Sequence, residues 1–332
     1  MSMTKQCCYT SVNLAYLSRA RVLAHTFKKY HPDIDFILVL SDIYPAGYSL
    51  NLVHEPFDSV VFSHELGIPD FWRWSFKHNV VELCTAVKPA AGLYFLALGY
   101  EHIMYIDPDI AIFNSLQPLF DDLSRYSGLL TPHQLTISPN SLMAIKDIEL
   151  CTLKHGLYNL GFYAVRNDGQ GHAFLEWWNS RVQRFCYEDV ASGIFTDQKW
   201  CDFAPIYFDN FCIIRDPGYN LASWNIHERS ITIDDSGPLV NDKYPLRFYH
   251  FTKYGGAGLV MTQRYAQTAE TIEIWFWYGR MLKQMSTNLA PKGHYYYGHY
   301  QDGAAIPQSE RDLFRDCPEL FPANPYQAMR CG

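Results

Sequence analysis

Two aspartates, Asp107 and Asp109, stand two positions apart directly after an apolar stretch, residues 102–106. A spacing of two places both carboxylates on the same side of an extended chain. Paired carboxylates with open coordination positions suit a hard divalent cation, which in turn binds the phosphates of a substrate. The same motif also fits a solvated turn closed by Asx hydrogen bonds, so the motif alone leaves both interpretations open.

The residues around this motif alternate between strand and helix patterns. Apolar residues recur at helical spacing in 14–30 and 80–98, and short apolar runs at 36–40 and 102–106 are typical of buried strands. This alternation predicts an α/β domain with a mainly parallel central sheet flanked by helices. Ligands of such sheets bind beyond the carboxyl ends of the strands, which is where Asp107 stands. Further strands are expected at 60–62, 110–113, 128–131 and 161–165, and further helices at 174–185 and 272–285.

Composition narrows the class of protein. The chain has 332 residues, 48% hydrophobic and 18% charged, which supports a large core and excludes a disordered, collagen-like or coiled-coil protein. Its formal net charge of -7 argues against a nucleic-acid binder, because such proteins usually carry a basic excess. Nine cysteines without paired spacing favour reduced thiols. With no apolar leader in residues 1–10 and no long apolar run, we expect a cytoplasmic protein without a membrane-spanning helix.

The segment from Lys88 to Ile110, which contains the Asp-Pro-Asp motif, resembles the helix–strand–DxD unit of the GT-A glycosyltransferases. It is most similar to the retaining family that includes glycogenin and the bacterial lipopolysaccharide galactosyltransferases. The resemblance implies a GT-A catalytic domain over residues 1–256. It leaves residues 257–332 as a helical and coil extension packed on that domain. It also implies a UDP-sugar as the donor substrate.

The same resemblance assigns a nucleotide-binding role to the first strand–helix turn. An asparagine there can hydrogen-bond the edge of a base and a tyrosine can stack on it. An ordinary helix cap at Ser11 or Asn13 explains the segment equally well. The residues implied to hold uracil and ribose are Thr10, Ser11, Asn13 and Tyr16.

Three later segments resemble the sugar-facing residues of the family. Lys88 resembles a basic residue that contacts donor phosphate or sugar, although it lies farther from the DxD motif than in the family. Asn159 resembles a residue that faces the donor sugar and acceptor, and Gly161 beside it would allow a close backbone approach or a β-bulge. Asp197 and Gln198 resemble the Asp-Gln pair on the reacting face of the sugar, where Asp197 would orient hydroxyl groups. An N-cap is the alternative for this pair.

His250 resembles the late histidine that completes the metal shell of the family. The resemblance implies that Asp107, Asp109 and His250 hold one divalent ion, with Lys253 and the backbone amide of Gly255 near the diphosphate. Such a mixed nitrogen and oxygen shell suits Mn²⁺ better than Mg²⁺, which prefers oxygen. A buried core histidine between two aromatic residues is the alternative.

The reaction implied is the transfer of a sugar from a UDP-sugar to an acceptor hydroxyl, with retention of anomeric configuration. An inverting enzyme remains open, with Glu228 or Asp202 as its general base. A nucleotidyltransferase is disfavoured, because residues 7–20 contain no glycine for a phosphate loop. A non-catalytic carbohydrate-binding protein would use the aromatic residues and need no metal site.

The acceptor is expected to be a glycan or a lipid-linked saccharide of polysaccharide biosynthesis, and residues 218–229 could line its pocket. The C-terminal extension is rich in aromatic and basic residues, which fits either peripheral contact with the inner face of a membrane or core packing. The residues concerned are Trp275, Phe276, Trp277, Arg280, Lys283 and Tyr295 to Tyr297.

Overall fold

The computed structural model describes residues 4–286 and 294–327 and is built around one seven-stranded sheet. Four of its six neighbouring strand pairs are parallel, and one strand, β7, runs antiparallel to both of its neighbours. The mainly parallel sheet predicted from the sequence is therefore confirmed. Across the sheet the strands are β3 (Ser59–Phe62), β2 (Asp35–Leu40), β1 (Gln6–Val12), β4 (His102–Ile106), β7 (Tyr158–Arg166), β6 (Gly128–Pro132) and β8 (Phe211–Ile213).

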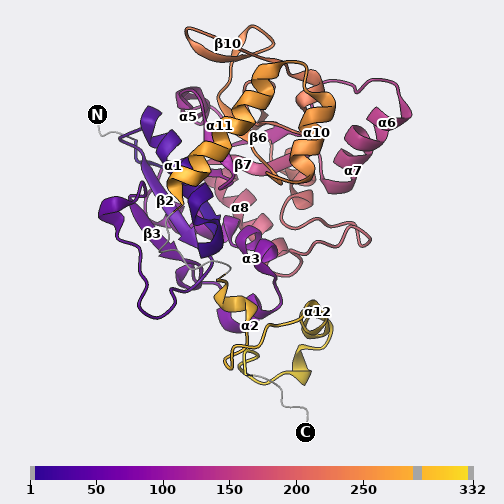
Figure 1. Cartoon of the computed structure of the whole chain (residues 1–332). Helices are drawn as coiled ribbons and strands as arrows, with labels where there is room; N and C mark the ends of the chain where they lie inside the picture. Colours follow the sequence, from indigo (N-terminus) through magenta and orange to yellow (C-terminus); the bar gives the residue numbers. More distant parts are fainter. Residues whose placement is uncertain (1–3, 287–293, 328–332) are drawn as a thin grey trace.

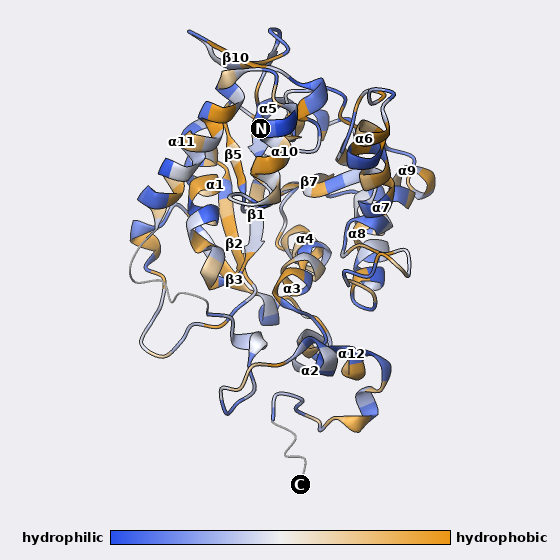
Figure 2. Cartoon of the chain, turned by 45° about the vertical axis from the view of Figure 1, so that its right-hand side comes forward, coloured by the Kyte–Doolittle hydropathy of each residue, from blue (hydrophilic) through white to orange (hydrophobic). Residues whose placement is uncertain are grey.

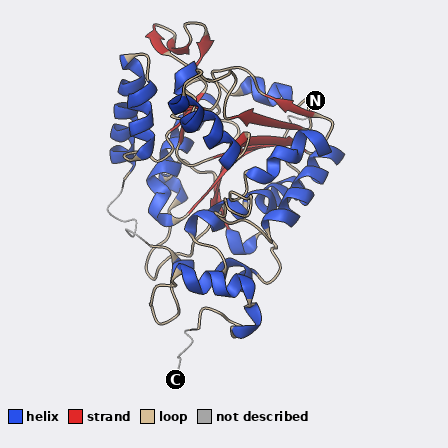
Figure 3. Cartoon of the chain, turned by 90° about the vertical axis from the view of Figure 1, so that its right-hand side faces the viewer, coloured by secondary structure: helices blue, strands red, loops and turns tan. Residues whose placement is uncertain are grey.

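Helices cover both faces of this sheet (Figures 1 and 3). Because successive strand residues face opposite sides, Tyr9 of β1 enters the hydrophobic cluster formed with α3 (Val80–Ala86), α4 (Lys88–Ala97) and α8 (Gly169–Val182). Its neighbour Cys8 enters the other cluster, formed with α1 (Leu17–Tyr30) and α5 (Gln117–Asp122). Burial on both faces explains why these strands read as nearly continuous apolar runs.

The two long helices expected before the DxD motif both differ in detail from the sequence pattern. The first begins as a 3₁₀ turn, η1 (Leu14–Tyr16), continues as α1 and ends at His31, because a residue before proline avoids helical angles. The second breaks at Val87 into α3 and α4, and Pro89 lies in the first turn of α4, where proline is tolerated. Among the described residues, Val80–Ala97 alone has the length and hydropathy of a membrane span, but 61% of it is buried in the protein.

A second, three-stranded sheet joins distant parts of the chain beside the carboxyl end of β4. It contains β5 (Ile110–Ile112), β13 (Phe248–His250) and β9 (Leu221–Ala222). β13 pairs antiparallel with β5, and His250 lies opposite Ile110. A third sheet lies apart from these, at the top of Figure 1, and consists of β10 (Ile231–Asp234), β11 (Gly237–Val240) and β12 (Tyr244–Pro245).

The C-terminal part divides into two. The helices α10 (Ala257–Tyr265) and α11 (Ala269–Met285) follow β13, and α11 packs on α1 through a cluster that contains Trp275 and Tyr278. Residues 294–327 instead pack on α2 (Phe71–Phe76) and form the lobe at the bottom of Figure 1. This lobe contains η7 (Tyr296–Gly298), α12 (Gln308–Asp316) and η8 (Pro318–Leu320).

The remaining short helices lie in the connections. They are η2 (Leu52–His54), η3 (Ser63–Glu65), α6 (Leu142–Ala144), the π-helical η4 (Ile145–Leu150), α7 (Cys151–His155), η5 (Lys199–Phe203), α9 (Ala204–Tyr207) and η6 (Ile226–Glu228).

Candidate functional site

The structure brings Asp107, Asp109 and His250 together. Asp107 directly follows β4, Asp109 directly precedes β5, and the pairing of β5 with β13 carries His250 to them. The Phe251 amide donates a hydrogen bond to the Asp109 carbonyl oxygen at 2.8 Å, which fixes this register. One ligand atom from each of the three side chains lies within 4.8 Å of the others. Nε2 of His250 is 3.0 Å from Oδ1 of Asp109 and 3.8 Å from Oδ2 of Asp107.

A contact with Asn159 orients the imidazole ring of His250. Nδ1 of the buried His250 lies 3.2 Å from Oδ1 of Asn159, so Nδ1 donates and Nε2 faces the carboxylates. Burial disfavours the imidazolium, but the Asp109 carboxylate outweighs it and raises the pKa of His250. Metal-ligating histidines are oriented in this way by a partner of the other ring nitrogen. The two carboxylates and the imidazole therefore fit a divalent cation in chemistry and in direction.

Gly161 allows the histidine to approach the central sheet. A Cβ atom at this position would lie 2.5 Å from Cε1 of His250 and 2.7 Å from Oδ1 of Asn159. Real Cβ atoms do not approach other atoms so closely, so only glycine fits. Both explanations that the sequence allowed for this glycine have support, because the pairing of β7 with β6 also shifts register between Leu130 and Pro132, opposite residues 158–163.

Lys88 is buried and joins two carboxylates rather than extending to solvent. Its Nζ lies 3.3 Å from Oδ1 of Asp107 and 3.1 Å from Oδ2 of Asp197, and it donates to the Leu160 carbonyl at 3.0 Å. The ammonium is thus shared between two ion pairs and one hydrogen bond. Burial opposes the positive charge, but Asp107 and Asp197 raise the pKa of Lys88 above its ordinary value. Tyr105 adds a hydrogen bond from its hydroxyl to Asp107 at 2.7 Å.

Asp197 and Gln198 lie on the opposite wall of the same site. Burial raises the pKa of Asp197, and the neighbouring Lys88 opposes that shift. Oε1 of Gln198 accepts hydrogen bonds from the Leu160 amide at 3.1 Å and from Nδ2 of Asn159 at 3.2 Å. Nε2 of Gln198 donates to the His155 carbonyl at 2.9 Å. The Gln198 amide is therefore held with its oxygen toward the sheet.

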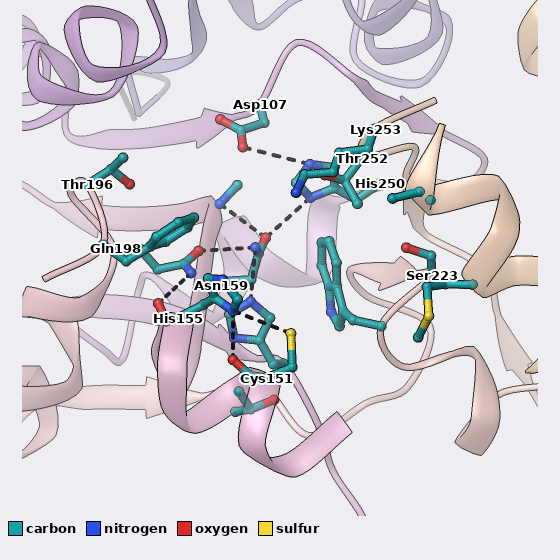
Figure 4. A pocket seen from close by; sticks show the side chains of 18 of the residues that line it. Asp107, Cys151, His155, Asn159, Thr196, Gln198, Ser223, His250, Thr252 and Lys253 are labelled. Carbon is teal, nitrogen blue, oxygen red and sulfur yellow. Dashed lines mark hydrogen bonds and ion pairs between the residues drawn. The ribbon is translucent and has the colours of Figure 1, made fainter. Parts of the chain in front are cut away.

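These residues surround one pocket of about 550 Å³, shown from close by in Figure 4. Its lining includes the metal-binding group together with Lys88, Asn159, Asp197 and Gln198. Ser223 and Trp224 of the segment 218–229 line the pocket, as the sequence suggested, whereas the sequence analysis missed others, among them His133. Burial lowers the pKa of His133 to about 4, so its ring is neutral. The other wall residues include Lys146, Ile148, Cys151, Thr152, His155, Ser223, Thr252, Lys253 and Met261.

The residues expected to hold the nucleoside lie outside the lining of this pocket. Thr10 and Ser11 are buried, and Ser11 shares a hydrogen bond with the Ser41 hydroxyl at 3.1 Å. Nδ2 of Asn13 donates to the His294 carbonyl at 3.2 Å. Tyr16 is 46% exposed. The Arg19 guanidinium lies over one face of its ring, 4.2 Å from the centroid, which leaves the other face for stacking.

Asp42 is a further residue at this end of the sheet that the sequence analysis did not single out. It lies two residues beyond Leu40, the last residue of β2, a position at which ligand-facing side chains are expected. Its carboxylate accepts hydrogen bonds from the Leu14 amide at 3.1 Å and the Tyr296 amide at 2.8 Å. Asp42 thus ties the first strand–helix turn to the C-terminal lobe.

Of the two residues expected near the diphosphate, one lines the pocket and the other does not. Lys253 lines the pocket and has a left-handed backbone, with a φ of 49°. Gly255 is exposed, with a φ of 79°, and does not line the pocket. The amide of the next residue, Gly256, donates to the Lys253 carbonyl at 3.0 Å, so it is already engaged.

Comparison with known proteins gives two sequence relatives, and no protein-family model matches the chain. Both relatives are uncharacterized proteins of Bacillus subtilis (strain 168). YfnF is 30% identical over 175 residues, which are 52% of this chain and only 57% of YfnF. YfnD is 26% identical over 251 residues, 74% of this chain and 76% of YfnD.

Among solved structures, the galactosyltransferase LgtC, in complex with donor and acceptor sugar analogs, is similar with a TM-score of 0.51 and 16% sequence identity. The similarity covers 85% of this chain and 96% of LgtC. At this identity the likeness concerns the fold. The GT-A fold predicted from the sequence is confirmed by it.

Proposed function

We propose that the chain is a metal-dependent glycosyltransferase that moves a sugar from a UDP-sugar to a hydroxyl of a glycan or lipid-linked acceptor. The observation that carries the proposal is the convergence of Asp107 and Asp109 with His250, which lies more than a hundred positions later in the sequence, at the carboxyl end of β4. In a fold shared with LgtC, ligands are expected at this end of the sheet.

The chemistry of the donor set supports a divalent ion, with Mn²⁺ preferred. Two carboxylates and an imidazole, with phosphate oxygens completing the shell, form a mixed nitrogen and oxygen set. When bound, the ion supplies positive charge next to the departing diphosphate. Lys88 forms ion pairs with Asp107 and Asp197 and so keeps both carboxylates in place in the pocket lining. Lys253 on the pocket wall adds positive charge for the diphosphate.

Retention of configuration is supported by the hydrogen bonds that Glu228 and Asp202, the candidate bases of an inverting enzyme, already accept. Glu228, a possible base of an inverting enzyme, accepts hydrogen bonds from the Leu135 and Thr136 amides. Asp202 accepts one from the Leu157 amide at 2.6 Å. Neither residue lines the pocket. Because these two carboxylates are engaged away from the pocket, we propose that the departing phosphate takes the acceptor proton, while Asn159, Asp197 and Gln198 orient the donor sugar.

We propose that the nucleoside contacts Thr10, Ser11, Asn13 and Tyr16. Asn13 has one amide hydrogen bonded to His294, so its Oδ1 stays available to a base or ribose. Tyr16 is exposed and can stack on uracil. We also propose the Gly255 amide as a donor to the diphosphate. We propose a catalytic domain over residues 1–256, with residues 257–332 as its extension. We also propose that the protein acts in the cytoplasm.

The proposal is tested with UDP-glucose, UDP-galactose and their N-acetyl forms, by thermal shift and by donor hydrolysis. Each donor is assayed with Mn²⁺ and with a chelator, and Asp109→Asn serves as the control for the metal site. We expect one donor to stabilise and be hydrolysed by the wild-type chain only with the metal. A chain that responds to none of the nucleotide sugars, or equally with the chelator, contradicts the proposal. Glycan binding that persists in Asp109→Asn without nucleotide binding would identify a carbohydrate-binding protein instead.

A further inference from the structure

One wall of the pocket is a helical segment whose outer side is unusually apolar. Residues 142–155 run through α6, η4 and α7 without leaving helical backbone angles. Their outer side exposes Leu142 by 71%, Met143 by 55%, Leu150 by 51% and Leu153 by 60%. Exposed side chains at this helical spacing form a single stripe along the segment.

The charges of this segment are sorted between its two sides. Asp147 faces inward, where it is bonded to Arg264 at 2.7 Å and to the Tyr265 hydroxyl at 2.9 Å. Glu149 accepts a hydrogen bond from the Ser138 hydroxyl at 2.7 Å. The two lysines, Lys146 and Lys154, are exposed. From 142 to 157 every exposed side chain is thus leucine, methionine or lysine.

The apolar side continues onto the neighbouring helices η5 and α9. Nζ of Lys199 donates to the Leu153 carbonyl at 2.8 Å, and Asp202 accepts from the Leu157 amide, so the two segments are in contact. Figure 2 shows α6, α7 and α9 gathered on one side of the molecule. The exposed apolar residues of this neighbour are Phe203, Ile206 and Tyr207. We call residues 142–157 and 203–207 together the docking face.

The inner side of the same segment lines the proposed active site. Ile148, Cys151, Thr152 and His155 all belong to the pocket wall, and the exposed Lys146 of the docking face also borders the pocket. A ligand held at the docking face is therefore separated from the pocket by the thickness of one helix. Among the C-terminal aromatics, Trp275 and Tyr297 are buried, whereas Phe276 is 66% exposed and Tyr296 40%.

We infer that the docking face rests on the surface of a lipid bilayer containing anionic phospholipids. A helix with an apolar stripe and lysines at its border is the pattern of an interfacial helix, and its two acidic groups are engaged, Asp147 by Arg264 and Glu149 by Ser138. The two lysines complement the negative headgroups, whereas a protein partner or second copy would leave them unpaired or require acidic residues. Resting on the proposed function, the inference also assigns the acceptor to the lipid-linked class, presented at the bilayer next to the pocket.

The test is vesicle sedimentation of the full chain, with phosphatidylcholine alone and with phosphatidylcholine containing phosphatidylglycerol. We expect binding to the anionic vesicles, and loss of that binding in Leu150→Ser/Leu153→Ser. Removing both charges in Lys146→Gln/Lys154→Gln should weaken partitioning by about thirtyfold, since each lysine near an anionic surface contributes roughly fivefold. The matched control is Leu52→Ser/Val53→Ser, which removes two exposed apolar side chains from η2, on another side of the molecule.

Several results overturn the inference. They are an absence of vesicle binding, equal binding by all variants, or loss of binding in the η2 control as well. A dimer in light scattering that the Leu150→Ser/Leu153→Ser variant dissociates would assign the face to a second copy instead. Hydrolysis of a soluble UDP-sugar by this variant should equal that of the wild type, because neither leucine lines the pocket. Vesicle binding without any UDP-sugar hydrolysis would leave the bilayer contact standing and reject only the glycosyltransferase proposal.

Discussion

Replacing Lys88 by methionine should destabilise the protein far more than removing an ordinary surface lysine. The Lys88 ammonium is buried between Asp107 and Asp197, and it also holds the Leu160 carbonyl. Without it, the buried Asp197 carboxylate loses its only ion pair in the described part of the chain. Breaking a buried pair by removing one partner costs about 3–5 kcal/mol, because the other charge is left uncompensated.

The expected shift in melting temperature follows from the size of the chain. For 332 residues, an unfolding entropy of roughly 2.1 cal/mol/K per residue gives about 0.7 kcal/mol/K, so Lys88→Met should lower Tm by about 4–7 °C. The control is Lys28→Met. Lys28 also pairs with a carboxylate, Asp58, at 2.6 Å and with two backbone carbonyls, but it lies at the surface. Its loss should cost about 1 kcal/mol or less.

A double variant separates charge balance from packing. In Lys88→Met/Asp197→Asn both partners are neutral, so the double variant should recover about half or more of the stability lost by Lys88→Met. The assay is differential scanning calorimetry, without metal, of the wild type, Lys88→Met, Asp197→Asn, the double variant and Lys28→Met. Equal shifts for Lys88→Met and Lys28→Met, or a double variant whose loss is the sum of the two single losses, would refute this account of Lys88.

Three other predictions concern the metal site and the stereochemistry. Asn159→Ala removes the acceptor of the His250 Nδ1 proton, so Mn²⁺ affinity by calorimetric titration should fall about 10–100-fold with the fold retained in circular dichroism; an unchanged affinity contradicts this role. Gly161→Ala places a Cβ against the His250 ring, so Mn²⁺ binding should weaken without any change to a ligand, whereas wild-type affinity would show that the ring can shift freely. Asp202→Asn and Glu228→Gln should retain donor turnover, and loss of turnover in either variant with normal Tm would favour an inverting enzyme.

The fold followed from the sequence wherever burial leaves a periodic signal. The strands at 36–40 and 102–106 are apolar on both faces because helices cover both faces, and both were predicted within a residue or two of their bounds. The break at Val87 was less visible, since the apolar spacing continues through it from α3 into α4. The antiparallel direction of β7 leaves no signal in its own residues, because it depends on the path of the chain that leads into it.

Within the site, the metal-binding group was predicted through resemblance and chemistry together. Asp107 and Asp109 are two positions apart in sequence. His250 reaches them only through the pairing of β13 with β5, which no local pattern encodes. The part played by Lys88 was also hidden, because a lysine on a helix gives no sign of burial. Trp224 and His133 lie in polar loops whose contacts are set entirely by tertiary packing.

The most direct test of the account is the binding of Mn²⁺ in the presence of UDP, followed by electron paramagnetic resonance of free manganese. The account predicts that the wild-type chain binds one ion, that UDP tightens this binding, and that Asp109→Asn and His250→Ala each abolish it. If both variants bind Mn²⁺ as tightly as the wild type, or if UDP binds the wild-type chain equally well with a chelator present, the three side chains do not hold an ion against the diphosphate.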